Sequence, residues 1–170
     1  DDPGEADKLS GHVAGNLPLM KARFDAALSL LRKHKTVDPR RIAAIGYSFG
    51  GKVVLDMARQ GADLAGVVSF WGLVGTQHPA QKGRVKAKVL VFNGKDDPMA
   101  PPEQIRQFQQ EMTAAAVDYK LIDYPNLKHA FTRPDANARG KKHNLPLAYD
   151  AEADRKSWTE MQDFFKRVFR

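Results

Sequence analysis

Apolar residues recur along this chain in two patterns: at steps of three and four residues in some stretches, and as short unbroken runs in others. The stepped pattern predicts helices over residues 17–34, 49–60, 101–116 and 148–169. The unbroken runs predict strands over residues 42–47, 64–71, 85–92 and 117–124. Because strands and helices alternate, we predict an α/β fold with a mainly parallel sheet and helices on its faces.

The first and last of these helices each have a recognisable apolar face. Asn16 can cap the first, whose predicted buried face consists of Leu17, Met20, Phe24, Leu28 and Leu31. The predicted inward face of the last consists of Trp158, Met161, Phe164, Phe165 and Val168. Before that helix, residues 132–147 show no periodicity, and we predict a long loop that is either a functional lid or disordered.

The length and composition are those of one globular domain. A chain of 170 residues that is 42% hydrophobic can bury a core, and we expect a single domain over residues 1–170. The absence of cysteine excludes disulfides, thiolate metal sites and a cysteine nucleophile. Since no apolar run is long enough to span a bilayer and the first residues are acidic, we expect a soluble, cytoplasmic protein, although a removed signal would leave no trace.

The net charge of +7 gives little support to a nucleic-acid partner. The 27 Lys and Arg residues are spread among 20 acidic ones, and aromatic residues do not alternate with them. We therefore expect no nucleic acid and no membrane as partners, and read the positive charge as a mild attraction for small anionic substrates.

The strongest chemical signal is Gly46-Tyr47-Ser48-Phe49-Gly50-Gly51, between a predicted strand and a predicted helix. A G-x-S-x-G sequence in that setting is typical of a nucleophile on a sharp turn, where glycines two residues either side avoid a Cβ clash. The alternative is a glycine-rich turn with an idle serine.

A serine nucleophile needs a base, and the base is best oriented by a carboxylate. In α/β-hydrolases the chain order is serine, acid, histidine, with the last two on loops after later strands. Asp96 and Asp97 follow the strand ending at residue 92, and the G-x-x-D spacing favours Asp97, although both could simply form a turn. His129 alone among the five histidines lies in a short loop after the next strand.

In the predicted mechanism His129 deprotonates Ser48, Asp97 holds the imidazole tautomer, and an acyl-enzyme is then hydrolysed. This reaction calls for no cofactor and no metal. Tyr47 and Trp71, which adjoin the serine and end the next apolar run, are candidate substrate contacts.

The chain resembles the dienelactone hydrolase family of α/β-hydrolases over nearly its whole length. The resemblance rests on residues 42–51, 70–72, 88–91, 94–101, 108, 111–112 and 124–131. It implies a three-layer sandwich and cleavage of a lactone or ester by Ser48, Asp97 and His129, with the N–H of Phe49 in the oxyanion hole. It also implies that Arg133 could hold a substrate carboxylate, the alternative being an exposed loop arginine.

The sequence departs from the family pattern in three ways. Ser48 stands where the namesake enzyme has cysteine, which favours general esterase activity, and Trp71 stands where relatives often have a smaller or polar residue. The family fold also has strands before a helix like 17–34, which flank the serine strand and supply the second oxyanion donor. We expect either another chain, as in a homo-oligomer, or a missing preceding segment to cover the edge of strand 42–47.

Three functions fit these features. The leading one is a serine esterase or lactonase. A peptidase or acyltransferase of the same fold is the second, and a noncatalytic fragment or binding protein that retains the three residues is the third.

Overall fold

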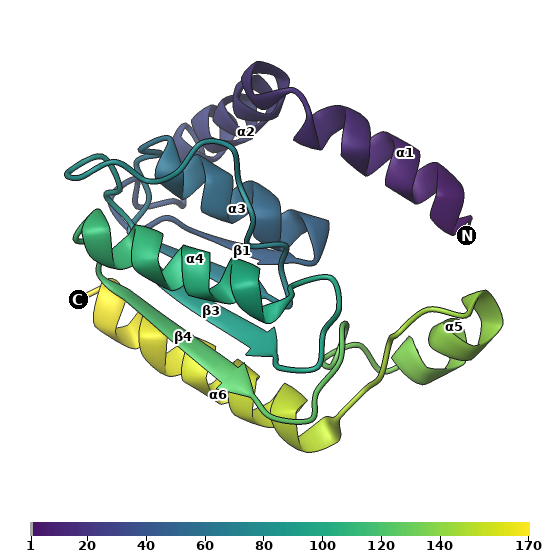
Figure 1. Cartoon of the computed structure of the whole chain (residues 1–170). Coiled ribbons are helices and arrows are strands. Elements are labelled where there is room, and N and C mark those ends of the chain that lie inside the picture. The colour runs from purple at the N-terminus through teal and green to yellow at the C-terminus, as the bar shows by residue number, and fades with distance from the viewer. Residues whose placement is uncertain (1) are drawn as a thin grey trace. The chain divides into compact units, whose positions relative to one another are not determined.

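In the computed structural model, which describes residues 2–170, the chain forms two compact units, Asp1–Ile42 and Ala43–Arg170 (Figure 1). The first unit contains the helices α1 (Pro3–Ala14) and α2 (Leu17–Arg32). Asn16 caps α2 as predicted, since its side-chain oxygen accepts a hydrogen bond of 3.0 Å from the N–H of Leu19.

Two details of this unit differ from the prediction. Helix α1 was not predicted, because it buries none of its residues and so has no apolar stripe to detect. In α2 the predicted apolar face is buried fully only at Met20, and Leu31 is 44% exposed.

The second unit is built on a parallel sheet. Its strands are β1 (Ala43–Tyr47), β2 (Gly66–Phe70), β3 (Lys88–Gly94) and β4 (Tyr119–Tyr124), which lie in this order. Each neighbouring pair is parallel, so every strand has its carboxyl end at the same edge. Loops that follow different strands are therefore brought together there.

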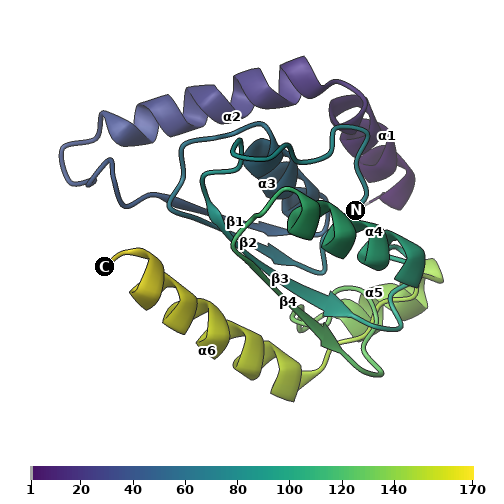
Figure 2. The same ribbon diagram turned by 60° about the vertical axis from the view of Figure 1, so that its left-hand side comes forward.

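Helices cover both faces of this sheet, which confirms the predicted α/β three-layer fold. Figure 2 shows α3 (Phe49–Arg59) and α4 (Pro102–Ala114) on one face and α6 (Ala151–Val168) on the other. Strand β2 is buried throughout, and β3 is buried beyond its first residue, as its near-continuous apolar sequence predicts. On the α6 face the core consists mainly of Val68, Phe70, Leu90, Phe92, Met161 and Phe164.

The prediction that Trp158 faces inward is wrong, since it is 49% exposed. The buried positions of α6 are Ala153, Ser157, Met161 and Phe164. These follow steps of four and three residues, and Trp158 lies one residue off that line, about 100° around the helix.

The predicted loop over residues 132–147 contains a helix, α5 (Ala136–His143). Its buried residues are small, Ala136 and Gly140, and a Cβ at Gly140 would lie 2.9 Å from the carbonyl oxygen of Leu147. A helix that packs through alanine and glycine has no large apolar stripe, which explains why periodicity did not detect it.

Strand β1 lies at one edge of the sheet, with Ile45 43% exposed and Tyr47 41% exposed. The expectation that a further segment or another chain pairs with this edge stays a prediction. Among residues 2–170, no helix is both long enough and apolar enough to cross a membrane.

Candidate active site

Ser48 lies on a sharp turn between β1 and α3. Its backbone has φ 51° and ψ −119°, a conformation that residues other than glycine avoid and that persists only where the surroundings enforce it. One such restraint is a 3.1 Å hydrogen bond from its N–H to the carbonyl oxygen of Phe70 on the neighbouring strand. Its side chain makes no capping bond to α3, so the hydroxyl is available for another partner.

The glycines around Ser48 allow a close crossing of backbones. A Cβ at Gly46 would lie 2.0 Å from the carbonyl oxygen of Gly50, and one at Gly51 would lie 2.7 Å from Cα of Gly72. A Cβ at Gly50 would meet no atom within 4 Å. The prediction that a Cβ would clash at Gly46 is confirmed. The same prediction for Gly50 is wrong, and the second position that excludes a Cβ is Gly51.

The structure brings together the three residues predicted from chain order. Oγ of Ser48 lies 2.9 Å from Nε2 of His129, and Nδ1 of His129 lies 2.7 Å from Oδ2 of Asp97. His129 follows β4 and Asp97 follows β3, so the parallel sheet delivers all three side chains to one edge. A carboxylate at Nδ1 fixes the proton there and leaves the lone pair of Nε2 facing the hydroxyl.

Asp97 is held more firmly than this single contact requires. Its Oδ1 accepts a hydrogen bond of 2.8 Å from the N–H of Met99, and the residue is only 2% exposed. Asp96, the alternative acid, is exposed. Geometry therefore gives the acid position beside His129 to Asp97.

Phe49 is the first residue of α3, so its N–H is among those that a helix leaves without an internal partner. The positive end of the helix dipole lies at the same place. An anionic oxygen formed next to Ser48 would be stabilised by this N–H, which fits the oxyanion role expected for Phe49.

Aromatic rings surround the imidazole and the turn. The Trp71 ring lies 4.9 Å from the His129 ring in an edge contact and 5.6 Å from the Tyr47 ring, which stacks on Phe70 at 4.8 Å. Tyr47 is well exposed, whereas Trp71 is only 7% exposed. Burial, with a smaller effect from the charge of Asp154, raises the pKa of Tyr47 above its usual value.

Arg133 is paired with Asp135. Its Nε and one terminal nitrogen donate to the two carboxylate oxygens at 2.5 and 3.2 Å. The side chains are 44% and 51% exposed. The hydrogen bonds from Arg133 are the main reason that the pKa of Asp135 lies below its usual value. A substrate carboxylate would therefore compete with Asp135 for this guanidinium.

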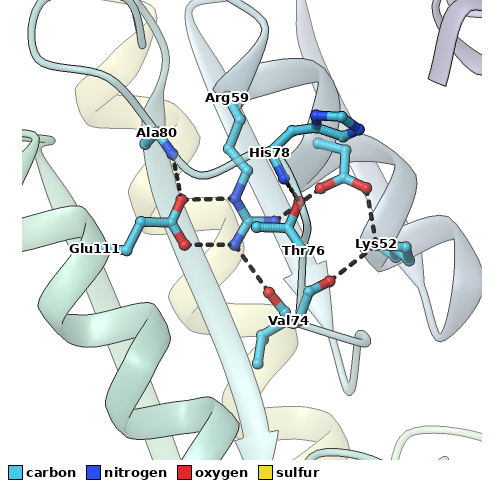
Figure 3. A network of polar contacts seen from close by, with 9 residues as sticks. Lys52, Arg59, Val74, Thr76, His78, Ala80 and Glu111 are labelled. Atoms are coloured by element: carbon cyan, nitrogen blue, oxygen red, sulfur yellow. Dashed lines mark hydrogen bonds and ion pairs between the residues drawn. The ribbon is translucent and has the colours of Figure 1, made fainter.

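A buried polar network behind the turn was not foreseen from the sequence. Figure 3 shows Arg59 of α3 bonded to both oxygens of Glu111 at 2.8 and 3.0 Å and to the carbonyl oxygen of Val74 at 2.8 Å. Arg59 also bonds Asp56 at 2.9 Å, and its side chain is fully buried. The sequence signal was a lone arginine among the apolar residues of α3, with an acid three residues earlier.

The same network fixes the loop after β2. Lys52 donates to the carbonyl oxygen of Gly75 at 2.9 Å and pairs with Asp56 at 2.9 Å, while Glu111 accepts a bond of 2.6 Å from the N–H of Ala80 (Figure 3). The positive charges of Lys52 and Arg59 balance the negative charges of Asp56 and Glu111, so burial leaves no uncompensated charge. The helix that begins at the serine turn is thus joined to the loop that begins at Trp71.

Two surface hollows lie between β4 and α6, and neither contains Ser48, Asp97 or His129. The larger, about 530 Å³, is lined by Ile122, Tyr124, Arg155, Lys156, Thr159 and Glu160. The smaller, about 240 Å³, adjoins it at Tyr124 and Lys156. Across residues 2–170, no group of three or more His, Asp or Glu side chains could hold a metal ion.

The sequence profile of the dienelactone hydrolase family matches residues 4–169. An uncharacterised protein of Caenorhabditis elegans, K02A2.1, is 29% identical over 88% of this chain and 94% of its own length. A Yersinia pestis protein named provisionally as a carboxymethylenebutenolidase is 29% identical over 75% of this chain. The match spans only 47% of that bacterial protein.

Among solved structures, the chain is similar to P91, a dienelactone hydrolase-like promiscuous phosphotriesterase from metagenomic libraries. The identity is 33% and the TM-score 0.87, over 98% of this chain and 69% of P91. The fold described above is therefore common to both chains over nearly the whole length of this one.

Proposed function

Because the chain belongs to the dienelactone hydrolase family, we propose that it cleaves a small ester or lactone with Ser48 as nucleophile. The observation that carries the proposal is the continuous series of short contacts from Ser48 through His129 to Asp97, at 2.9 and 2.7 Å. It starts at a serine whose backbone is held in a strained turn beside a helix N-terminus.

In the first half of the proposed reaction, Nε2 of His129 takes the hydroxyl proton of Ser48 while Oγ attacks the substrate carbonyl carbon. The carbonyl oxygen becomes anionic and accepts a hydrogen bond from the N–H of Phe49. The imidazolium is stabilised by Asp97 and returns the proton to the departing alkoxide. The acyl group is then bound to Oγ as an ester.

In the second half, His129 removes a proton from water, and the hydroxide attacks the acyl carbon. The C–Oγ bond breaks, Ser48 recovers its proton from His129, and a carboxylic acid leaves. Each proton thus passes through Nε2 of one histidine, and the proposed cycle uses no cofactor or metal.

The proposed substrates are small lactones and esters, in keeping with the butenolide-cleaving activity in the name of the Yersinia pestis relative. The formal charge of +7 favours anionic members of this class. Tyr47, which is 41% exposed beside Ser48, is the aromatic side chain that we propose to contact them.

The test combines covalent labelling with turnover. We expect a fluorophosphonate probe to modify Ser48 and the chain to hydrolyse p-nitrophenyl acetate, and we expect Ser48→Ala to abolish both. Ser10→Ala, a change in α1 outside the proposed catalytic residues, is the control and should change neither. Absence of both labelling and hydrolysis in the unaltered chain would contradict the proposal and favour a noncatalytic role. Ester formation with an added alcohol in place of hydrolysis would identify an acyltransferase.

A further inference from the structure

Two hydrogen bonds do not by themselves fix the catalytic imidazole. His129 contacts Asp97 through Nδ1 and Ser48 through Nε2, the two nitrogens of its ring. The ring can still turn by small angles about its Cα–Cβ and Cβ–Cγ bonds while both contacts persist. A further contact with the ring restricts this turning and so holds the orientation in which the lone pair of Nε2 faces Oγ of Ser48.

Trp71 supplies such a contact. Its ring meets the His129 ring at a centroid distance of 4.9 Å with an interplanar angle of 76°. We propose that Trp71 is a positioning residue for His129, and that its bond to Thr132 links the orientation of the imidazole to the segment over residues 132–147. This inference deepens the proposed function and rests on it.

Trp71 is itself unusually constrained. Its backbone has φ 38°, which bulky residues avoid, and its N–H donates to the carbonyl oxygen of Phe92 at 2.7 Å. Only 7% of the surface of Trp71 is exposed, so the protein covers most of the side chain. Little of the ring surface is therefore left for the substrate contact expected from the sequence. A strained backbone at this position persists because surrounding contacts enforce it.

The indole also bonds to the segment that follows His129. Nε1 of Trp71 donates to Oγ1 of Thr132 at 2.8 Å, and Thr132 comes three residues after the histidine. The far end of the segment returns to the same place, where the N–H of Ala148 donates to the carbonyl oxygen of His129 at 3.1 Å. A second bond, from the N–H of Asp150 to the carbonyl oxygen of Phe131, is 2.9 Å long.

The segment that contains α5 is therefore closed at its base by the catalytic histidine and fastened to Trp71 at its start. If that fastening is released, the indole can withdraw from the imidazole while the fold is retained. The loss should appear in the chemical step, because the bond joins two groups of the protein and acts on the imidazole that transfers the proton.

The test is a matched pair at one position. Thr132→Val keeps the shape and removes the acceptor, whereas Thr132→Ser keeps the acceptor. With p-nitrophenyl acetate we expect kcat to fall about tenfold in Thr132→Val with KM within about twofold, and Thr132→Ser to stay within about twofold of the parent. Trp71→Phe, which keeps a ring but lacks the N–H, should match Thr132→Val, and the double variant should be no worse than either single one.

A second readout is independent of turnover. The proton on Nδ1 of His129 gives a downfield NMR signal when the imidazole is held against Asp97, and we expect this signal to broaden in Thr132→Val and persist in Thr132→Ser. An unchanged signal in Thr132→Val would overturn the inference, as would equal kcat values for the two threonine variants. If Trp71→Phe instead raised KM and left kcat unchanged, Trp71 would be a substrate contact, as the sequence suggests, and not a positioning residue. If the parent hydrolyses no ester, the proposed function fails, and the NMR comparison still decides the role of Trp71.

Discussion

Nδ1 of His129 and Oδ2 of Asp97 lie 2.7 Å apart in a place that water scarcely reaches, with 4% and 0% of the two side chains exposed. A hydrogen bond to a carboxylate is stronger in such surroundings than in water. The other carboxylate oxygen is taken by the N–H of Met99, so Asp97 cannot rotate away without breaking two bonds. In the proposed mechanism, this contact acts on Ser48 through the tautomer and orientation of the imidazole.

Asp97→Asn should therefore lower kcat for an aryl ester by about 10³–10⁴-fold, because an amide at this position favours the wrong tautomer of His129. Asp96→Asn is the matched control, since Asp96 is the exposed neighbour on the same turn. It should retain activity within about threefold. Steady-state kinetics measure both variants. A larger fall in kcat in Asp96→Asn than in Asp97→Asn would identify Asp96, and not Asp97, as the acid.

The serine turn gives a second prediction. Gly46→Ala places a Cβ 2.0 Å from the carbonyl oxygen of Gly50, where only backbone could move, and should lower the free energy of unfolding by about 3 kcal/mol. Gly50→Ala meets no atom within 4 Å and replaces glycine in the first turn of α3. It should be neutral or stabilising by up to about 1 kcal/mol. Urea denaturation measures both changes, and equal losses would mean that contact at Gly46 is not the reason for the glycine.

Most of the confirmed predictions rest on two features of the sequence: runs of large apolar residues, and the order of the serine, aspartate and histidine along the chain. Strand β3 was predictable because it is buried beyond its first residue, and the proximity of Ser48, Asp97 and His129 was predictable because loops after parallel strands converge. That these residues are catalytic is still a proposal. Helices α1 and α5 were missed because one buries no residue and the other packs through small ones.

Contacts between distant polar side chains that belong to no recognised sequence motif could not be predicted. Arg59 and Glu111 are separated by 52 residues, and nothing in either local pattern specifies the partner. The same holds for Trp71 and Thr132, whose bond depends on where two loops end after folding. Trp158 is an error of another kind. Its large apolar side chain suggested burial, but its position around α6 is off the buried face, and the residue is exposed.

The Arg59 network predicts a stability effect of unusual size. Arg59→Met leaves Asp56 and Glu111 as buried charges without their common partner and should lower the free energy of unfolding by about 3–5 kcal/mol. Arg106→Met removes an arginine from an exposed pair with Glu103 on α4 and should cost no more than about 1 kcal/mol. Thermal and urea unfolding of the two variants give the comparison, and similar losses would show that burial of the pair does not matter.

The raised pKa values of two tyrosines predict that the folded state loses stability at alkaline pH. Burial is the main cause that raises the pKa of Tyr47 and of Tyr124, with Asp154 and Glu160 adding to it respectively. A raised pKa in the folded state means that the fold binds the phenolic proton more tightly than the unfolded chain does. The resulting stability is present below about pH 10 and is lost as the pH rises through the folded-state pKa. Tyr124→Phe should flatten this loss in urea titrations between about pH 9 and 11, and an unchanged slope would contradict the assignment.

Arg133 gives the last prediction, because its pairing with Asp135 determines how it could serve a substrate. If Arg133 binds a substrate carboxylate, Asp135 is its competitor. Removing the competing charge in Asp135→Asn should lower KM for an acidic ester such as a monoaryl succinate, and Arg133→Ala should raise it about tenfold. Neither change should alter KM for the neutral aryl acetate, which has no carboxylate to bind.

The required control separates this contact from net charge. Asp163→Asn removes the same charge from an exposed pair with Lys166 on α6, so it changes the overall field equally but leaves Arg133 paired. It should leave both KM values unchanged at moderate salt, since exposed charges farther apart than about 10 Å are screened. If Asp163→Asn lowers KM for the acidic ester as much as Asp135→Asn does, the effect belongs to the positive charge of the whole chain. Arg133 would then be an ordinary surface residue that pairs with Asp135.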